Sequence, residues 1–586
     1  MLGIVVCDVY SVIYTDGLDR ASESVLKDIL QDTAAFQQKG AEFSPKYQAG
    51  QWDGMVRLYK RDRSGRYFVP TGLIMRVCSE LHAYKMQNPE FDFRVRYDRK
   101  VPTQFLSDGH MAGIEFRPHQ LAMIETIKRG GKGRYLLSED EAEKLQSGVG
   151  QDIPIRLDGM GIWWSATGSG KTIASGGLIA DLGVQALFVV YGADLVVQTH
   201  KVFEKHLGAW LREHGHHVGC CVEGDLDFGY VTVASASTLV SAINPKSNKG
   251  VVTKALKKIG NSLMRLDSVG QTQARQVLSE IQKNWTGRNI NRLWSALNVL
   301  ERLFDEMHPK EIASLERAIN RLQESEAKKK EVLDYLETVD LLIFDEAHGV
   351  AAKGHYELAM KCPAYYRVAM SGTPLGRTSG DNLKIVGAFG DPVARVTNAE
   401  MVEQGFIPQA RIEMWNVKGT LGNYRWPRCY DEGIIFHGER NARIVEAVVE
   451  NQGKAVMCIY KSIAHGEILQ ELLGIAGLSV SNISGESPLY ERQEAVDDLV
   501  SGNIQVLLAS GIFTQGVDIP DVDVLVNVAG GKAPVQVLQR LGRGLRGEGL
   551  LLIDFSDGHH KLLSKHSKAR RALYEQQNCF EITDRR

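Results

Sequence analysis

The sequence predicts an α/β protein with two parallel-sheet units in tandem, a small α/β domain before them and a helical insertion in the first unit. The glycine-rich segment 165–172 lies between a short apolar strand, 161–164, and a helix-forming run. Five continuously apolar, strand-length segments follow it, separated by helix-length segments, and a second series of five follows residue 404. Such alternation indicates parallel, doubly wound sheets.

The size and composition are those of a globular protein with several domains. At 586 residues the chain is too long for one core, and 44% hydrophobic with 24% charged residues is ordinary for a folded domain. No apolar run approaches the roughly 18 residues of a membrane helix, and Asp8 interrupts the first apolar stretch. We therefore expect a cytoplasmic protein, in the host cytoplasm if a phage encodes it, with no membrane partner.

The eight cysteines form no Cys-x-x-Cys pair, so neither a disulfide framework nor a zinc ribbon is indicated. His214, His216, His217, Cys220 and Cys221 lie close together in the sequence. They form either a metal site or, as the pattern favours, a short buried strand at 218–222 with histidines at its polar entry.

The chain divides into three predicted domains, 1–105, 106–403 and 404–586. In the first, 2–14 and 91–97 have strand character and 22–36 has apolar residues at helical spacing. Between them, 43–54 carries Phe, Tyr and Trp beside lysine, and several arginines follow. These rings either stack on nucleic-acid bases or face a core, and spacing alone leaves both readings open.

The segment 165–172 has the pattern of a phosphate-binding loop. Small residues let consecutive backbone N–H groups and the start of the next helix point at one anion. Lys171 is placed to neutralise the β- and γ-phosphates and Thr172 to reach Mg²⁺. Ser165 replaces the first glycine of the usual pattern.

A pair of carboxylates follows the apolar strand 339–344. Asp345 is placed to hold Mg²⁺ through its water shell, and Glu346 to orient and deprotonate an attacking water. Earlier in the chain, Gln120 begins a helix at Pro118, where an amide can offer a donor and an acceptor to an adenine edge. Residues 130–158 are predicted to be a surface insertion with a short helix after Ser138.

Residues 241–337 are too many for a loop inside a compact domain. Apolar residues recur every three or four positions, which predicts a helical hairpin or small bundle. Between 241 and 300 ten Lys/Arg face two acids, Asp267 and Glu280. This segment is either a nucleic-acid face, a solvated helix surface or the docking site of a protein partner.

The second unit has no phosphate-binding loop of its own. Its segment 539–546 places Arg543 and Arg546 three residues apart, on one face of a helix. Across a cleft from Lys171 they would act as arginine fingers; on an exposed helix they would be a basic stripe.

Taken in order, these motifs resemble the superfamily 2 helicases of the DEAH-lettered kind over about residues 113–575. Within that group, 117–120, the run 553–557 and the basic 565–570 are similar to phage UvsW-type and XPB-like DNA helicases. Residues 43–54 more faintly resemble the N-terminal domain of UvsW-type enzymes. The further motifs that carry the resemblance are 233–239, Asp345-Glu-Ala-His348, Ser371-Gly-Thr373, Gly516-Val-Asp518 and 539–546.

The resemblance implies two RecA-like domains that close on ATP and Mg²⁺, with nucleic acid across both. Its catalytic residues would be Lys171, Asp345, Glu346, Arg543 and Arg546, with Mg²⁺ at Thr172 and Asp345. ATP would be bound by Gln120, Gly168, Ser169, Gly170, Lys171, Thr172, Asp518 and Gln539. His348, Ser371, Thr373 and Gly516 would couple the sites, and Asp194, Gln198, Ser237, Thr238, Thr514 and Gln515 would contact nucleic acid.

The implied function is that of an ATP-dependent DNA helicase or translocase that unwinds or remodels branched DNA or R-loops in recombination, repair or replication. Three alternatives remain at this point. The chain could be an RNA helicase, because such motors grip the backbone rather than the bases. It could be the motor subunit of a restriction system, or a catalytically inactive nucleic-acid clamp or annealing scaffold.

Overall fold

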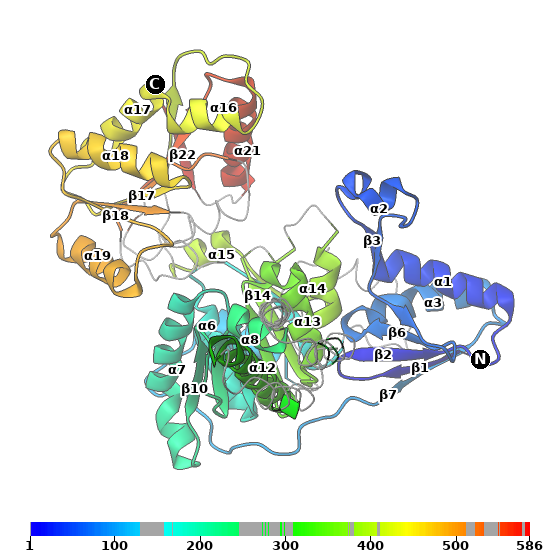
Figure 1. Cartoon of the computed structure of the whole chain (residues 1–586). Helices are drawn as coiled ribbons and strands as arrows, with labels where there is room; N and C mark the ends of the chain where they lie inside the picture. Colours follow the sequence, from blue (N-terminus) through cyan, green and yellow to red (C-terminus); the bar gives the residue numbers. More distant parts are fainter. Residues whose placement is uncertain are drawn as a thin grey trace. The chain divides into compact units, whose positions relative to one another are not determined.

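The computed structural model in Figure 1 confirms the α/β class, with parallel sheets in two successive lobes. We call residues 106–403 the first lobe and 404–586 the second lobe. The structure describes 2–128, 157–166, 168–244, 309–372, 374–375, 380–406, 411–510, 522–531, 549, 551–576 and 580–586, with six single positions between 272 and 298.

The N-terminal domain is a five-stranded mixed sheet of order β5-β6-β2-β1-β7. The predicted strand character of 2–14 is divided between two strands, because the chain turns at 7–9 and β1 pairs antiparallel with β2. The predicted helix 22–36 ends earlier, and its last residues form β3, which pairs with β4. The elements are β1 (Leu2–Val6), β2 (Tyr10–Tyr14), α1 (Arg20–Ala34), β3 (Ala35–Gln37), η1 (Ala41–Phe43), α2 (Pro45–Gln48), β4 (Met55–Arg57), β5 (Lys60–Arg61), β6 (Tyr67–Pro70), η2 (Thr71–Leu73), α3 (Ile74–Gln87) and β7 (Phe93–Tyr97).

The first lobe is built on an eight-stranded sheet of order β11-β10-β12-β9-β13-β14-β8-β15. The predicted strands are all present, and only the short β11 runs antiparallel to its neighbour. The central strands are buried on both faces, which explains their continuous apolar sequence. The strands are β8 (Met160–Ser165), β9 (Ala186–Val190), β10 (Val218–Val222), β11 (Asp225–Leu226), β12 (Val231–Ser235), β13 (Leu341–Asp345), β14 (Tyr366–Ser371) and β15 (Pro392–Val396).

Helices connect the strands of the first lobe. α6 follows β8 directly, α7 follows β9, and α8 follows β12 without a break. The helices are α4 (Pro118–Glu125), α6 (Lys171–Leu182), α7 (Ala193–Glu213), α8 (Ala236–Ile243), α13 (Lys353–Lys361), α14 (Asn382–Phe389) and α15 (Asn398–Glu403), with η4 (Ala347–Ala351) after β13.

Residues 237–338 form a compact unit of their own. Its described part includes α12 (Pro309–Leu336), which begins at a proline, a residue tolerated in the first turn of a helix. The predicted helices between 245 and 308 lie outside the described residues apart from six single positions, as does the predicted connector helix after Ser138.

The second lobe is a seven-stranded parallel sheet of order β18-β19-β17-β20-β21-β16-β22. The five predicted strands are present, and the sheet gains β16 and β22, which pair in parallel at one edge. β22 has only one apolar residue in five, so its sequence gives no strand signal. The elements are β16 (Arg411–Val417), α16 (Arg428–Tyr430), η5 (Asp431–Ile435), α17 (Gly438–Val449), β17 (Val456–Tyr460), α18 (Ile463–Ile475), β18 (Val480–Ile483), α19 (Leu489–Ser501), β19 (Val506–Ser510), β20 (Val524–Asn527), β21 (Leu551–Asp557), α21 (Lys561–Gln576) and β22 (Glu581–Arg585).

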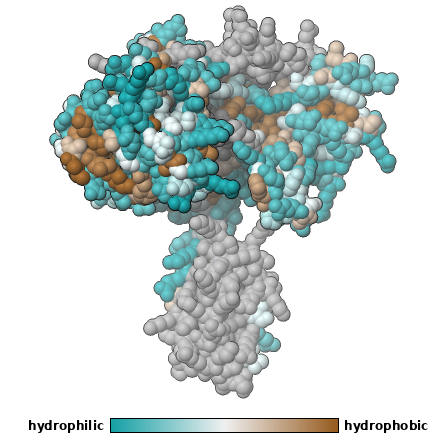
Figure 2. Space-filling model, turned by 90° about the horizontal axis from the view of Figure 1, so that it is seen from above, coloured by the Kyte–Doolittle hydropathy of each residue, from teal (hydrophilic) through white to brown (hydrophobic). Residues whose placement is uncertain are grey.

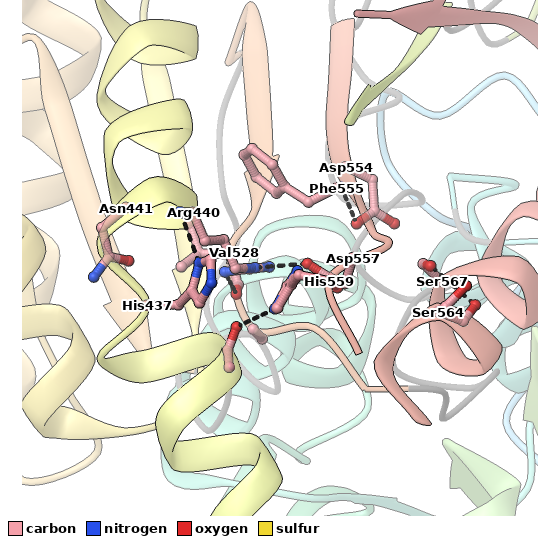
Figure 3. Close-up of polar contacts among 12 residues, drawn as sticks. His437, Arg440, Asn441, Val528, Asp554, Phe555, Asp557, His559, Ser564 and Ser567 are labelled. Atoms are coloured by element: carbon pink, nitrogen blue, oxygen red, sulfur yellow. Dashed lines mark hydrogen bonds and ion pairs between the residues drawn. The ribbon is translucent and has the colours of Figure 1, made fainter. Parts of the chain in front are cut away.

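A buried polar network ties α17 and α21 to β21 in the second lobe. Figure 3 shows Arg440 reaching from α17 toward Asp557, and their Nε and Oδ1 atoms lie 2.9 Å apart. Arg570 of α21 donates to both carboxylate oxygens of Asp554 at 2.8 and 3.0 Å. All four side chains are at most 1% exposed. The hydrogen bonds fix both helices at the carboxyl end of the sheet.

His465 makes the stability of the second lobe sensitive to acid. It is buried, its Nε2 lies 2.9 Å from Asn441 Oδ1, and burial followed by the charge of Arg440 lowers the pKa of His465 to about 3. Because this folded-state pKa is below the unfolded value, the imidazole binds a proton more readily after unfolding. Its contribution is complete above pH 6.5 and falls by up to about 1.4 kcal/mol per pH unit as the pH drops toward 3.

We expect His465→Gln to flatten the dependence of unfolding free energy on pH between 6.5 and 4, measured by urea titration. Burial also lowers the pKa values of His437 and His559, so these residues contribute with the same sign and some slope remains in the variant. An unchanged slope in the variant would contradict the prediction.

The described surface in Figure 2 is mostly hydrophilic, with hydrophobic groups gathered in limited patches. Large exposed apolar side chains include Phe43 in the N-terminal domain and Trp426 in the second lobe. Within the described ranges, no helix has the length and apolar character needed to cross a membrane.

Candidate nucleotide and nucleic-acid site

The predicted phosphate-binding loop joins β8 to α6 in a turn that needs glycine. Gly168 and Gly170 have φ angles of +85° and +77°, a region that favours glycine. Ser169 Oγ donates to Ala166 O at 2.7 Å and lies 2.6 Å from Ser165 Oγ. The serine that replaces the first glycine of the usual pattern therefore braces the loop from inside.

The start of α6 is built to receive an anion. Its N-cap is Gly170, which has no side chain to accept from the first N–H groups, and its first turn holds no acidic residue. Lys171 Nζ instead lies 3.3 and 3.1 Å from the carbonyl oxygens of Ser165 and Ala166, across the loop. Thr172, the next residue, is partly exposed. Uncapped N–H groups, the helix dipole and an ammonium together favour phosphate.

The acidic pair lies at the end of β13. Glu346 has a φ of +52°, an uncommon conformation for this residue, and its N–H donates to Asp345 Oδ1 at 2.8 Å. Ser371 Oγ donates to Glu346 Oε2 at 3.1 Å, and His348 Nδ1 lies 3.3 Å from the same oxygen. Three residues that the sequence assigns to catalysis and coupling thus meet at one carboxylate.

The strand order brings the phosphate-binding loop and the acidic pair together at the carboxyl end of the sheet. β14 is the one strand between β8 and β13, so the two strand ends are about 10 Å apart. In this register Asp345 pairs with Met370, and Ser371 pairs with Trp164. Trp164 Nε1 also donates to Gly372 O at 2.9 Å. No role for Trp164 could be predicted from the sequence, because aromatic residues are common in strands.

Gln120 contacts the phosphate-binding loop directly. Its Oε1 accepts from Arg117 N at 2.9 Å, and its Nε2 donates to Ser169 O at 3.2 Å. His119 Nε2 lies 2.8 Å from the same carbonyl oxygen. The start of α4 therefore supports the loop, and a contact between Gln120 and adenine stays a prediction.

The residues predicted to contact nucleic acid lie near other strand ends of the first lobe. Asp194 and Gln198 are on α7 after β9, and Asp194 Oδ2 accepts from Arg492 Nη1 at 2.8 Å. On α8, Ser237 is exposed and Thr238 is buried. Eight other predicted site residues lie outside the described residues: Thr373, Thr514, Gln515, Gly516, Asp518, Gln539, Arg543 and Arg546.

The histidines and cysteines of 214–221 have other neighbours. His214 Nδ1 lies 2.9 Å from Trp210 O, the ring of His216 lies against Tyr230, and His217 Nε2 lies 3.0 Å from Asp227 Oδ1. Cys221 is buried in β10. In the part of the chain that the structure describes, no three His, Cys, Asp or Glu side chains are grouped to hold a metal.

The aromatic segment of the N-terminal domain does not turn its rings into a core. Phe43 is 79% exposed and Tyr47 is 39% exposed. Trp52, partly buried, donates from Nε1 to Met55 O at 2.9 Å. Nucleic-acid contact by this segment stays a prediction.

Several known proteins are similar to this chain. A helicase of a Sulfolobus islandicus filamentous virus is 24% identical over 35% of this chain and 40% of its own length. A DNA 3′-5′ helicase of Haloarcula marismortui is 24% identical over 36% and 34%. The chain thus spans about a third to two fifths of the length of these curated relatives.

Among solved structures, the crystal structure of T4 UvsW is 13% identical with a TM-score of 0.34, covering 100% of this chain and 99% of that one. Saccharomyces cerevisiae Dbp5 bound to RNA and ADP BeF3 is 14% identical with a TM-score of 0.44, covering 80% and 94%. Both TM-scores are below 0.5, so family membership rests on sequence.

Three family models match the chain in succession. The model for the N-terminal domain of the DNA helicase UvsW matches 9–94, the model for the res subunit of type III restriction enzymes matches 113–376, and the helicase conserved C-terminal domain matches 439–548. The first model covers the N-terminal domain, the second covers the phosphate-binding loop and the acidic pair, and the third covers most of the second sheet. Taken together, these three matches make the chain similar to the superfamily 2 helicases of the UvsW type.

Proposed function

We propose that this chain is an ATP-dependent DNA helicase or translocase that remodels branched DNA or R-loops in recombination, repair or replication. One observation carries the proposal: Glu346, held by Ser371, is separated by the single strand β14 from a phosphate-binding loop whose helix N-terminus is uncapped. DNA is favoured over RNA because the N-terminal domain matches a DNA helicase family. We place the activity in the cytoplasm, of the host if the gene is viral.

The residues present fit ATP and Mg²⁺. The open start of α6 and Lys171 suit the phosphates, and Thr172 with Asp345 supplies the oxygen ligands that Mg²⁺ prefers. Bound Mg²⁺ would neutralise charge on the phosphates. Lys171 would leave the carbonyl oxygens of Ser165 and Ala166 to bind phosphate, because a charged acceptor is stronger than a neutral one.

Within this proposal, Glu346 orients the attacking water and takes its proton. Ser371 and His348 contact the Glu346 carboxylate. Movement of the strand ends that carry the predicted nucleic-acid contacts would therefore move Glu346, the general base. Arg543 and Arg546 supply positive charge from the second lobe, as the motif predicts. Hydrolysis coupled in this way drives stepping along the backbone.

We expect Lys171→Ala to weaken nucleotide binding about 10- to 150-fold, because a charge-assisted contact to phosphate is lost. Equilibrium titration with a fluorescent ATP analogue measures it. Lys201→Ala is the matched control, because Lys201 is exposed on α7 of the same lobe. Equal affinities for Lys171→Ala and the wild type would exclude this loop as the nucleotide site.

The proposal is tested by ATP hydrolysis with single-stranded, duplex, forked and four-way DNA and with matched RNA. Branched DNA is expected to give the largest stimulation. Preferential stimulation by RNA would instead support the RNA helicase. Cleavage of plasmid with Mg²⁺ would support a restriction enzyme, and phosphate release at background with every substrate would leave the inactive clamp.

A further inference from the structure

A cluster of aromatic and basic side chains lies on the second lobe, and all of its members except His566 lie outside the motifs that carry the resemblance. We call it the Trp426 platform, and it comprises Tyr424, Trp426, Arg428, Tyr430, Lys461 and His566. We propose that the Trp426 platform stacks on an unpaired base of the nucleic acid that the enzyme acts on. The inference rests on the proposed function and adds to it a specific contact of the second lobe with its substrate.

The indole of Trp426 packs against two other rings and stays partly exposed. Its ring centroid lies 5.2 Å from that of Tyr430 and 5.6 Å from that of His566, while 44% of the residue stays exposed. Cations lie over the neighbouring rings, Arg428 at 4.5 Å from the Tyr424 centroid and Lys461 at 5.3 Å from the Tyr430 centroid. A partly exposed indole beside cations is the composition of a base-stacking site.

Hydrogen bonds hold the segment 421–433, which contains Trp426, against the rest of the second lobe. Tyr430 OH donates to Ala529 O at 2.8 Å, and Cys429 Sγ lies 3.0 Å from His560 Nδ1. His559 Nε2 lies 2.9 Å from Gly433 O, a contact drawn in Figure 3, and Leu421 N donates to His559 O at 2.9 Å. Since the indole is already held in place, little conformational entropy is lost when a base stacks on it.

The platform lies where a doubly wound sheet binds its ligands. Lys461 follows directly on β17, at the carboxyl end of a central strand. α21 passes beside α16 and carries exposed Lys561, Lys565 and Lys568. The nearby acids are Asp431 and Glu432, and Glu432 lies 3.6 Å from Arg428.

The positive charges near Trp426 favour a nucleic acid over an apolar protein surface as the partner of the platform. Arg428 has Glu432 as a counter-charge, but a hydrophobic protein surface that covered Trp426 would remove water from Lys461 without pairing its charge, which is costly. A single-stranded nucleic acid offers a ring to the indole and phosphates to the cations at once. The platform therefore fits a base with its backbone phosphate.

The test measures binding of a fluorescent single-stranded thymidine oligonucleotide by anisotropy. Trp426→Ala is expected to weaken binding roughly 5- to 150-fold, the range for losing one stacked base. Trp426→Phe keeps a ring and is expected to stay within about threefold of wild type. ATP hydrolysis without nucleic acid should be the same in all three proteins, because Trp426 has no place in the nucleotide site.

Tyr490→Ala is the matched control. Tyr490 is an exposed aromatic of the same lobe, 68% accessible, and its hydroxyl donates to the Glu491 carboxylate, whose negative charge repels phosphate. Equal affinity of Trp426→Ala and wild type, with DNA-stimulated hydrolysis intact, would overturn the platform and leave the proposed function standing. Absence of both binding and stimulation in the wild type would overturn both.

Discussion

Glu346→Gln is expected to reduce nucleic-acid-stimulated ATP hydrolysis by about 10²- to 10⁴-fold while leaving nucleotide binding nearly unchanged. The substitution keeps size and shape but removes the negative charge that accepts a proton, and general-base catalysis is worth about that factor. Ser371 can still donate to the remaining side-chain carbonyl oxygen, so the strand ends stay in register. Single-turnover hydrolysis at saturating ATP separates the chemical step from binding.

Glu213→Gln is the control for this experiment. Glu213 is exposed at the end of α7 in the same lobe, so its charge change is the same and its position is remote from β13. It should hydrolyse ATP at the wild-type rate. If Glu346→Gln retained more than about a tenth of wild-type turnover, Glu346 would not be the general base.

The sequence was sufficient for the parallel sheets because their strands are buried on both faces. β9 reads as an unbroken apolar run for that reason, and β12 and β14 are mostly apolar; the phosphate-binding loop and acidic pair follow strands of this kind directly. The edges were harder to predict. β22 is exposed and mostly charged, and it forms by pairing with β16 rather than by its own hydrophobicity.

Some residues of the candidate site could likewise be predicted from the sequence, and others could not. Lys171, Glu346 and Ser371 carry local signals, because each follows its strand within a few residues. The Trp426 platform combines separate segments: the packing of α16 against α21 brings the rings of Trp426 and His566 together, and Lys461 reaches the Tyr430 ring from the end of β17. Periodicity describes one element at a time, so contacts of this kind are visible only in the folded chain.

The buried network of the second lobe explains how α21 is held. Arg570 Nη1 and Nη2 donate to Gly531 O and Phe555 O at 2.6 and 2.8 Å besides the two bonds to Asp554, so one guanidinium joins three elements. Burial by itself would raise the pKa of Asp554, but the charge and hydrogen bonds of Arg570 outweigh it and keep that pKa below its usual value. Both groups are therefore ionised in the folded lobe.

Arg570→Leu is expected to destabilise the second lobe by about 3–5 kcal/mol, because it leaves Asp554 buried without its counter-charge. Arg571→Leu is the matched control. It removes the neighbouring arginine, whose partners Glu575 and Asp584 are exposed, and should cost about 0–1 kcal/mol. Urea unfolding measures both variants.

The two variants should also differ in their response to acid. Without Arg570, burial raises the folded-state pKa of Asp554 above its unfolded value, so the penalty is full at neutral pH and shrinks as the carboxylate is protonated. In the wild type the sign is opposite, since the lowered pKa adds stability above pH 3.8 that is lost as the pH falls below it. A penalty for Arg570→Leu that is equal at pH 7 and pH 5, or no larger than that of Arg571→Leu, would show that the buried charge of Asp554 does not depend on Arg570.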